Sequence, residues 1–258
     1  IVREALKMMG IDFPLEITTF ADIPAQTGLG SSSAFTVGLL HALYALKGQM
    51  VTKYQLASTA AEIEINKLGR TIGKQDHFAA AYGNLNTISF YADEKVVVEP
   101  VFYRPETLTE LEKNMIMFYT KLKRDASEVL KEQKKEAINK KATLRKMKEL
   151  VPELRETLSS GVVLNRVGEI LHKGWILKRS LTKNISNGVI DSYYEKARSA
   201  GALGGKLLGA GGGGFLLLYV EKQNRERVIK SLKELYSMPV GIHAGGSRIT
   251  YYDQTMVK

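Results

Sequence analysis

A short segment rich in glycine and serine, Gly28-Leu29-Gly30-Ser31-Ser32-Ser33, has the residue types that hold a phosphate group. Glycines let the backbone turn tightly and approach a ligand closely. Serines at the start of a helix lie where unpaired N–H groups and the helix dipole favour an anion, and a hydroxyl there can also bind Mg²⁺. The segment is neither a P-loop nor a dinucleotide-binding fingerprint, so a plain turn with a serine cap stays an open interpretation.

Two carboxylates with a lysine between them are a second candidate for chemistry. Glu64 lies near the end of one expected helix, and Asp76 opens the next, near its positive end. Together with Lys74, they fit metal binding combined with proton abstraction. The alternative is that these are solvated charges at helix ends.

A third candidate segment runs from Lys206 to Phe215 and has five glycines in the six residues 209–214. A two-residue turn would be enough for a hairpin, and a longer glycine run costs conformational entropy. Such a run is useful where one backbone must pack against another backbone or against a phosphate. A loose surface loop is the alternative.

Hydrophobic periodicity and turn residues predict the elements that position these segments in the first 120 residues. Helices are expected at residues 1–10, 34–46, 53–68 and 76–82. Strands are expected at residues 15–20, 84–91, 95–101 and 115–119.

The pattern then becomes charged and helical over residues 121–200, with breaks expected near Pro152, Gly161 and residues 184–188. Further strands are expected at residues 206–208, 215–220, 240–243 and 248–252, with a helix at 224–236. We therefore predict two domains, residues 1–120 and 121–258.

Composition narrows the class of protein. The 258 residues include no cysteine and four histidines, which excludes disulfides and thiolate chemistry. No apolar run approaches the roughly 20 residues of a membrane span, so we expect a cytoplasmic protein with no membrane partner. The net charge of +10 fits nucleic acid, an anionic surface, anionic small molecules or simply a solvated helix face.

Taken in this order, the three segments resemble the GHMP kinase superfamily, the small-molecule kinases related to galactokinase, homoserine kinase and mevalonate kinase. The resemblance covers almost the whole chain. Within the superfamily, several segments are similar to those of D-glycero-D-manno-heptose 7-phosphate kinases: residues 73–83, 118–120, 174–175, 185–187 and 201–206.

The resemblance implies a role for each segment. The residues that would hold the phosphates of ATP are Gly28, Leu29, Gly30, Ser31, Ser32, Ser33, Gly211, Gly212 and Gly213. Ser32 and Glu64 would ligate Mg²⁺, and residues 209–214 would also brace the phosphate loop. Asp76 would be the base that takes the proton from the acceptor hydroxyl, and Lys74 would lower its pKa or contact phosphate. Arg124 and Arg179 are candidates to hold the phosphate of a sugar phosphate.

The implied fold is α+β with two domains. The first would be related to domain 2 of ribosomal protein S5, the second would be ferredoxin-like with added helices, and the active site would lie between them. Members of the superfamily begin with a strand and a glycine-rich segment bearing an Asp that contacts the sugar. This sequence starts after that segment, so we expect it to be part of a longer protein.

The leading hypothesis is a kinase that uses ATP and Mg²⁺ to phosphorylate a hydroxyl of a heptose phosphate. A kinase of L-fucose or galactose is the nearest alternative, and the others are a ligand sensor without turnover and an RNA-binding protein. The complete set of Ser32, Glu64 and Asp76 argues against the sensor. No aromatic residues alternate with basic ones in the manner of an RNA-binding surface, so no nucleic-acid partner is expected. The oligomeric state stays open.

Overall fold

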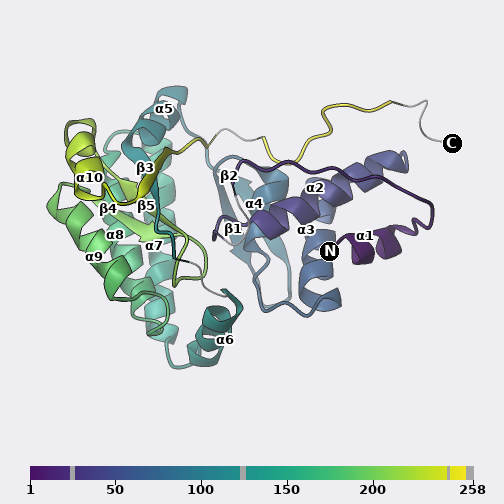
Figure 1. The fold of residues 1–258 in the computed structure, drawn as a ribbon, viewed down its shortest axis with the longest axis horizontal. Coiled ribbons are helices and arrows are strands. Elements are labelled where there is room, and N and C mark those ends of the chain that lie inside the picture. The colour runs from purple at the N-terminus through teal and green to yellow at the C-terminus, as the bar shows by residue number, and fades with distance from the viewer. Residues whose placement is uncertain (24–26, 123–125, 243–244, 254–258) are drawn as a thin grey trace. The chain divides into compact units, whose positions relative to one another are not determined.

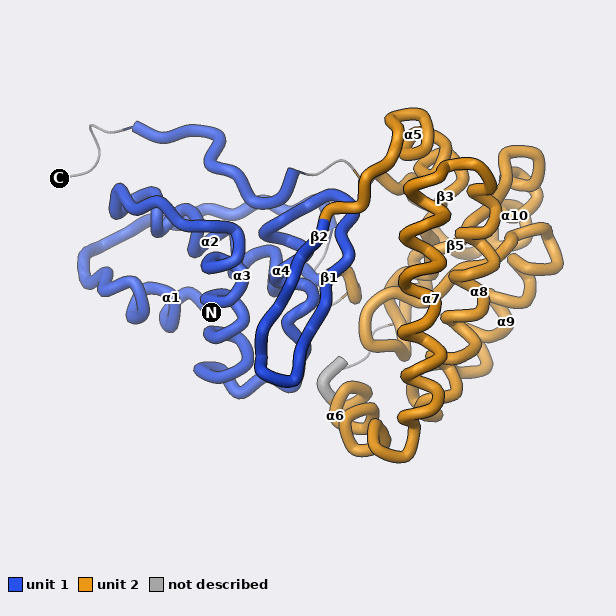
Figure 2. Tube along the Cα trace, turned by 180° about the vertical axis from the view of Figure 1, so that it is seen from behind, with its two compact units in different colours: residues 1–25, 30–99, 243–258 blue, residues 26–29, 100–242 orange. Residues whose placement is uncertain are grey.

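The computed structural model describes residues 1–23, 27–122, 126–242 and 245–253, and divides the chain into two compact units (Figure 2). Unit 1 comprises residues 1–25, 30–99 and 243–258, and unit 2 comprises residues 26–29 and 100–242. The glycine- and serine-rich segment therefore contributes to both units. The boundary between the two units within this segment lies between Leu29 and Gly30. The predicted domain boundary near residue 120 stays a prediction.

Unit 1 is built around the apolar helix α2, which contacts three other helices (Figure 1). Its helices are α1 (Val2–Met9), α2 (Ser31–Leu46), α3 (Lys53–Ala61) and α4 (Gln75–Tyr82). A π-helical turn (Glu62–Lys67) extends α3. The two predicted strands form β1 (Asn86–Phe90) and β2 (Val96–Pro100), which pair with each other. The core contains Leu40, Leu43, Leu56, Ile63 and Phe78.

Unit 2 is built on an antiparallel sheet whose described strands follow the order β4-β5-β3-β6. These strands are β3 (Met115–Tyr119), β4 (Gly204–Leu207), β5 (Phe215–Tyr219) and β6 (Tyr236–Pro239). The helices are α5 (Pro105–Asn114), α6 (Ala126–Glu136), α7 (Lys141–Ser160), α8 (Asn165–Arg179), α9 (Gly188–Ser199) and α10 (Arg225–Ser231), with a 3₁₀ turn at Lys222–Asn224. The split β-α-β pattern with β3 and β5 in the centre confirms the expected ferredoxin-like topology with added helices.

Three strand predictions were wrong, because a strand needs a partner as well as a suitable sequence. Residues 15–20 and 248–252 form no strand, and Phe20 is 95% exposed. The last described strand of the sheet is Tyr236–Pro239, which pairs with β3. Residues 240–242 of the predicted strand 240–243 form no strand, and His243 lies outside the described residues. The preceding helix, α10, ends at Ser231, five residues before its predicted end, and Tyr236 lies in β6 instead.

Two helix predictions were also wrong. Pro152 lies inside α7 and does not break it; we attribute this to packing of α7 along α8, which outweighs the cost of about 3 kcal/mol for an interior proline. The helix Pro105–Asn114 was not predicted, although Pro at its first position is a typical start signal. In the described part of the chain, no helix is both long and apolar enough to cross a membrane.

Helix α8 lies close to the sheet because small residues meet at the contact. A Cβ atom added to Gly204 of β4 would lie 1.9 Å from the carbonyl oxygen of Gly168 in α8. A Cβ atom on Gly168 would lie 2.7 Å from Cβ of Leu203 and 3.1 Å from the ring of Tyr219. A side chain at Gly168 would therefore push α8 away from Leu203 and Tyr219 of the sheet region.

Gly168→Ala is therefore expected to lower the free energy of unfolding by about 1–3 kcal/mol through overpacking. Gly174→Ala in the same helix is the matched control, since its Cβ would meet only Leu150 Cδ1 at 3.6 Å. This control is expected to gain up to about 1 kcal/mol from helix propensity. Urea unfolding measures both variants, and equal effects would contradict the proposed packing constraint.

Candidate active site

Helix α2 begins at Ser31, three residues before its predicted start, so all three serines lie in its first turn. Gly30 caps the helix with a φ of +69°, a conformation that favours glycine. The first intrahelical bond runs from the N–H of Ala34 to the carbonyl of Gly30 at 2.9 Å. The N–H groups of Ser31, Ser32 and Ser33 therefore have no acceptor within the helix, an arrangement that attracts an anion.

Asp76 lies in the first turn of α4 and is exposed. Its carboxylate is close to the start of α2, because a Cβ atom added to Gly30 would lie 3.3 Å from Asp76 Cγ and Oδ2. The structure thus places two of the predicted site residues, 46 positions apart in sequence, next to each other in unit 1. Any side chain at position 30 would press on this carboxylate.

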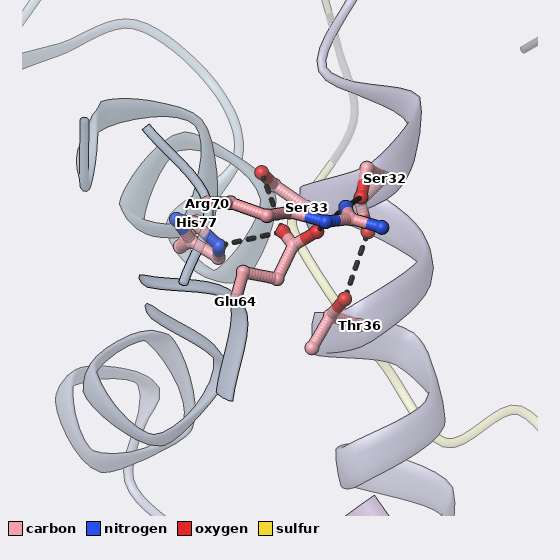
Figure 3. A network of polar contacts seen from close by, with 6 residues as sticks. All are labelled: Ser32, Ser33, Thr36, Glu64, Arg70 and His77. Carbon is pink, nitrogen blue, oxygen red and sulfur yellow. Dashed lines mark hydrogen bonds and ion pairs between the residues drawn. The ribbon is translucent and has the colours of Figure 1, made fainter. Parts of the chain in front are cut away.

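The carboxylate of Glu64 is fully buried and is surrounded by hydrogen-bond donors (Figure 3). Its Oε2 atom accepts from His77 Nε2 at 2.8 Å and from the hydroxyl of Ser33 at 3.2 Å. Its Oε1 atom accepts from the hydroxyl of Ser32 and from Nη1 of Arg70. The predicted neighbours Ser32 and Glu64 are therefore in direct contact.

The π-helical turn after α3 creates this arrangement. Leu68 N–H donates to Ile63 at 3.0 Å, and Arg70 N–H donates to the carbonyl of Glu64 at 3.0 Å. The backbone thereby folds back, and the Arg70 side chain returns to the Glu64 carboxylate. Sequence reasoning missed Arg70, and the only local signal was a basic residue shortly after an acidic helix end.

Burial raises the pKa of Glu64, but hydrogen bonds from His77 and Ser32 and the charge of Arg70 act in the opposite direction. The net result is a pKa below the ordinary value of a glutamate. Glu64 is therefore an anion at neutral pH, held by donors on both of its oxygens.

Lys74 lies at the N-terminal cap of α4, but its ammonium group forms an ion pair with Glu94 in the turn between β1 and β2. Arg179 forms an ion pair with Asp191 at 2.8 Å, and this aspartate also accepts from the hydroxyl of Ser186. Arg124 lies outside the described residues. Lys74 and Arg179 are therefore paired with other carboxylates and are not among the groups that donate to Glu64.

In unit 2 the two glycine segments pack backbone against backbone. A Cβ atom added to Gly209 would lie 2.7 Å from Cα of Gly28, and one added to Gly214 would lie 2.4 Å from the carbonyl oxygen of Thr27. Both positions have positive φ, +71° and +99°. The glycine run is therefore a packed element rather than a loose loop, and it supports the first residues of the glycine- and serine-rich segment.

The glycine run is itself held by hydrogen bonds. Gly212 N–H donates to Ile185 at 2.9 Å, and Gly214 N–H donates to Leu122 at 3.1 Å. Gln133 donates to the carbonyl of Ala210 at 2.9 Å, and Lys178 donates to that of Gly209 at 2.5 Å. Because the Gly212 N–H already has an acceptor, this group braces the glycine run; phosphate binding by residues 211–213 stays a prediction.

Comparison with known proteins places this geometry in a family. The model of the GHMP kinases N terminal domain matches residues 1–84, and that of GHMP kinases C terminal matches residues 163–237, together more than half of the chain. The chain belongs to the GHMP kinase family. Its two-unit α+β structure has the fold of that family.

Individual GHMP kinases show the degree of similarity. The chain is 31% identical over 219 residues to D-glycero-alpha-D-manno-heptose 7-phosphate kinase of Campylobacter jejuni, covering 84% of this chain and 64% of the relative. A crystal structure of D-glycero-D-manno-heptose 1-phosphate kinase from Bacteroides thetaiotaomicron matches with a TM-score of 0.63, 29% identity and coverage of 88% and 64%. The mevalonate kinase of Methanococcus jannaschii shares the fold, with a TM-score of 0.70, 22% identity and coverage of 94% and 74%. The chain thus spans 64% of the length of each of these two heptose phosphate kinases.

The Mg²⁺ ion implied for a GHMP kinase can be tested against the residues present. Ser32 and Glu64 offer the hard oxygen atoms that Mg²⁺ prefers, and they are in contact. The described residues contain no cluster of three or more acidic or histidine side chains that could hold a metal ion alone. The set therefore fits a Mg²⁺ ion that takes its remaining ligands from nucleotide phosphates and water, as is usual for this ion.

The Glu64 network predicts a pH-dependent stability. The folded chain lowers the pKa of Glu64, so its ionisation stabilises the fold above the ordinary glutamate pKa, and this contribution is lost as pH falls through the folded value. Glu64→Gln is expected to cost about 1.5–3 kcal/mol at neutral pH and progressively less under acid conditions. Urea unfolding at a series of pH values measures the difference.

Glu62→Gln is the matched control, because Glu62 lies in the same π-helical turn and its side chain is 41% exposed. For this control, we expect only a small change in the free energy of unfolding at every pH. A Glu64→Gln penalty that stayed constant down to acid pH would contradict the assignment of the stabilisation to the ionised carboxylate.

Proposed function

We propose that the protein containing this chain is a sugar kinase that transfers the γ-phosphoryl group of ATP to a hydroxyl of a heptose phosphate, with D-glycero-D-manno-heptose 7-phosphate as the substrate. The observation that carries the proposal is the position of the exposed Asp76 carboxylate against Gly30, at the anion-attracting start of α2. The similarity to two heptose phosphate kinases supports the substrate class.

In this proposal Asp76 is the general base. Its carboxylate accepts the proton of the acceptor hydroxyl as the oxygen of that hydroxyl forms a bond to the γ-phosphorus, while the bond from that phosphorus to the β–γ bridging oxygen breaks. ADP leaves with the electron pair of the broken bond, and the proton remains on Asp76 until solvent removes it. Phosphoryl transfer of this kind depends on positioning and charge neutralisation more than on covalent chemistry.

The first turn of α2 would bind the nucleotide phosphates through the N–H groups of Ser31, Ser32 and Ser33. Ser32 and Glu64 would hold Mg²⁺, which neutralises phosphate charge when it is bound. The glycine run would keep residues 27 and 28 in place, because its backbone packs against theirs. No residue is assigned to the phosphate of the sugar, since Arg179 is paired with Asp191 and Arg124 lies outside the described residues.

Asp76→Asn is expected to lower kcat by about 10²–10⁴-fold, the usual range for loss of a general base. The substitution keeps the size of the side chain and leaves α2 unchanged, so ATP affinity should be retained. Asp93→Asn in the β1–β2 turn is the control, because the Asp93 carboxylate accepts a hydrogen bond from the nearby Lys95 N–H at 3.1 Å and lies outside the candidate site. Steady-state ADP release and calorimetric ATP binding on the full-length protein separate the two effects. An Asp76→Asn variant that is folded and keeps half of the wild-type kcat rejects this base.

The substrate class is tested by ADP release from the full-length enzyme with heptose 7-phosphate, heptose 1-phosphate, L-fucose and galactose. The highest kcat/KM is expected with heptose 7-phosphate. A higher kcat/KM with fucose or galactose would contradict the substrate class but leave the kinase assignment intact. No ADP release with any of the four would contradict the assignment itself.

A further inference from the structure

Arg70 places a positive charge between the two side chains to which the proposed function assigns Mg²⁺. A single nitrogen of its guanidinium, Nη1, donates to the hydroxyl oxygen of Ser32 at 2.5 Å and to Oε1 of Glu64 (Figure 3). The Ser32 hydroxyl in turn donates to the same Oε1 atom. A cation that binds these two oxygens must therefore displace Arg70 Nη1.

The two partners of this ion pair differ in their exposure to solvent and in the number of contacts that hold them. The Glu64 side chain has no exposed surface, and its other oxygen is held by Ser33 and His77. The Arg70 side chain is 42% exposed, and its guanidinium donates to Ser32 and Glu64. If the pair separates, the carboxylate stays in place, and the guanidinium moves into water.

Charge explains why an arginine is useful here. A buried carboxylate without a counter-charge is costly, so metal-free Glu64 needs a cation nearby. The guanidinium remains protonated at every physiological pH, and it therefore neutralises Glu64 under all such conditions. The same property makes it a permanent competitor, because a divalent cation and a guanidinium repel each other at these short distances.

We propose that Arg70 is an internal counter-cation that occupies the Ser32–Glu64 pair in the metal-free protein and leaves when a divalent cation binds there. It thereby sets the metal affinity of the site. This inference rests on the metal ligands of the proposed function, but not on the identity of the sugar. Arg70 acts through Ser32 and Glu64 and is a positioning residue rather than a catalytic one.

The test is a titration of the full-length protein, carrying one equivalent of a non-hydrolysable ATP analogue, with Mn²⁺ as the probe. The electron paramagnetic resonance signal of free Mn²⁺ follows the binding. Arg70→Gln is expected to bind Mn²⁺ about tenfold more tightly than the wild type, because it removes a charge-assisted competitor. Arg70→Lys keeps a positive charge and is expected to remain within about threefold of the wild type.

Arg166→Gln is the matched control for a general loss of one positive charge. Arg166 forms an ion pair with Glu153 at 2.9 Å in unit 2, and its side chain is 52% exposed, similar to that of Arg70. This control is expected to leave Mn²⁺ affinity unchanged. If Mn²⁺ affinity rose as much in Arg166→Gln as in Arg70→Gln, the increase would be a general effect of charge, and the proposed local competition by Arg70 would be overturned.

A second measurement, on the wild-type protein, tests the proposal even if Arg70→Gln fails to fold. The ¹⁵N–¹H signal of the Arg70 side-chain Nε, assigned by its loss in Arg70→Lys, is expected to shift towards that of a solvated arginine as diamagnetic Mg²⁺ is added. An unmoved signal at saturating Mg²⁺ would overturn the proposal.

The outcomes also separate this inference from the proposed function. Equal or weaker Mn²⁺ binding by a folded Arg70→Gln would overturn the inference alone, since Arg70 would then orient Glu64 rather than compete for it. Absence of Mn²⁺ binding in every form would overturn both the inference and the Ser32–Glu64 metal assignment, while ADP release would still decide the kinase activity.

Discussion

The buried carboxylate of Glu64 is the constraint around which the candidate site residues of unit 1 are organised. A charge without access to water needs donors on both of its oxygens. These donors come from the first turn of α2, from α4 and from the loop after the π-helical turn. The position of each of these elements is thus tied to the same carboxylate. The start of α2 cannot move relative to α4 without breaking a hydrogen bond to Glu64.

Unit 2 holds its part of the glycine- and serine-rich segment in a different way. There the contacts are between backbones, and glycine is required because Cβ atoms at Gly209 and Gly214 would collide with residues 27 and 28. Close backbone packing of this kind leaves little room for movement. The segment is therefore fixed by glycine packing before Leu29 and by a buried charge network after Gly30.

The same network has two demands that conflict. Stability of the metal-free chain favours a fixed cation beside Glu64, whereas the proposed binding of Mg²⁺ would favour a cation that can leave. An arginine with a 42% exposed side chain would meet both demands, because it can pair with the carboxylate and can return to water once a divalent cation replaces it. A histidine in that position would not carry a permanent charge, because its ordinary pKa lies close to neutral pH.

Local patterns in the sequence determined a large part of this structure. The helices that carry Glu64 and Asp76, the β1–β2 pair and the glycine cap at Gly10 were predictable, because periodicity and turn residues act within a few positions. The family resemblance also placed Ser32, Glu64 and Asp76 in one candidate site. Tertiary structure alone decided that residues 15–20 and 248–252 form no strand and that Tyr236 joins the sheet, because strand pairing depends on a distant partner. It also decided that Arg70 contacts Ser32, which is 38 residues away in the chain. No local pattern encodes that contact, because it exists only when the π-helical turn and the start of α2 have packed around the same buried charge.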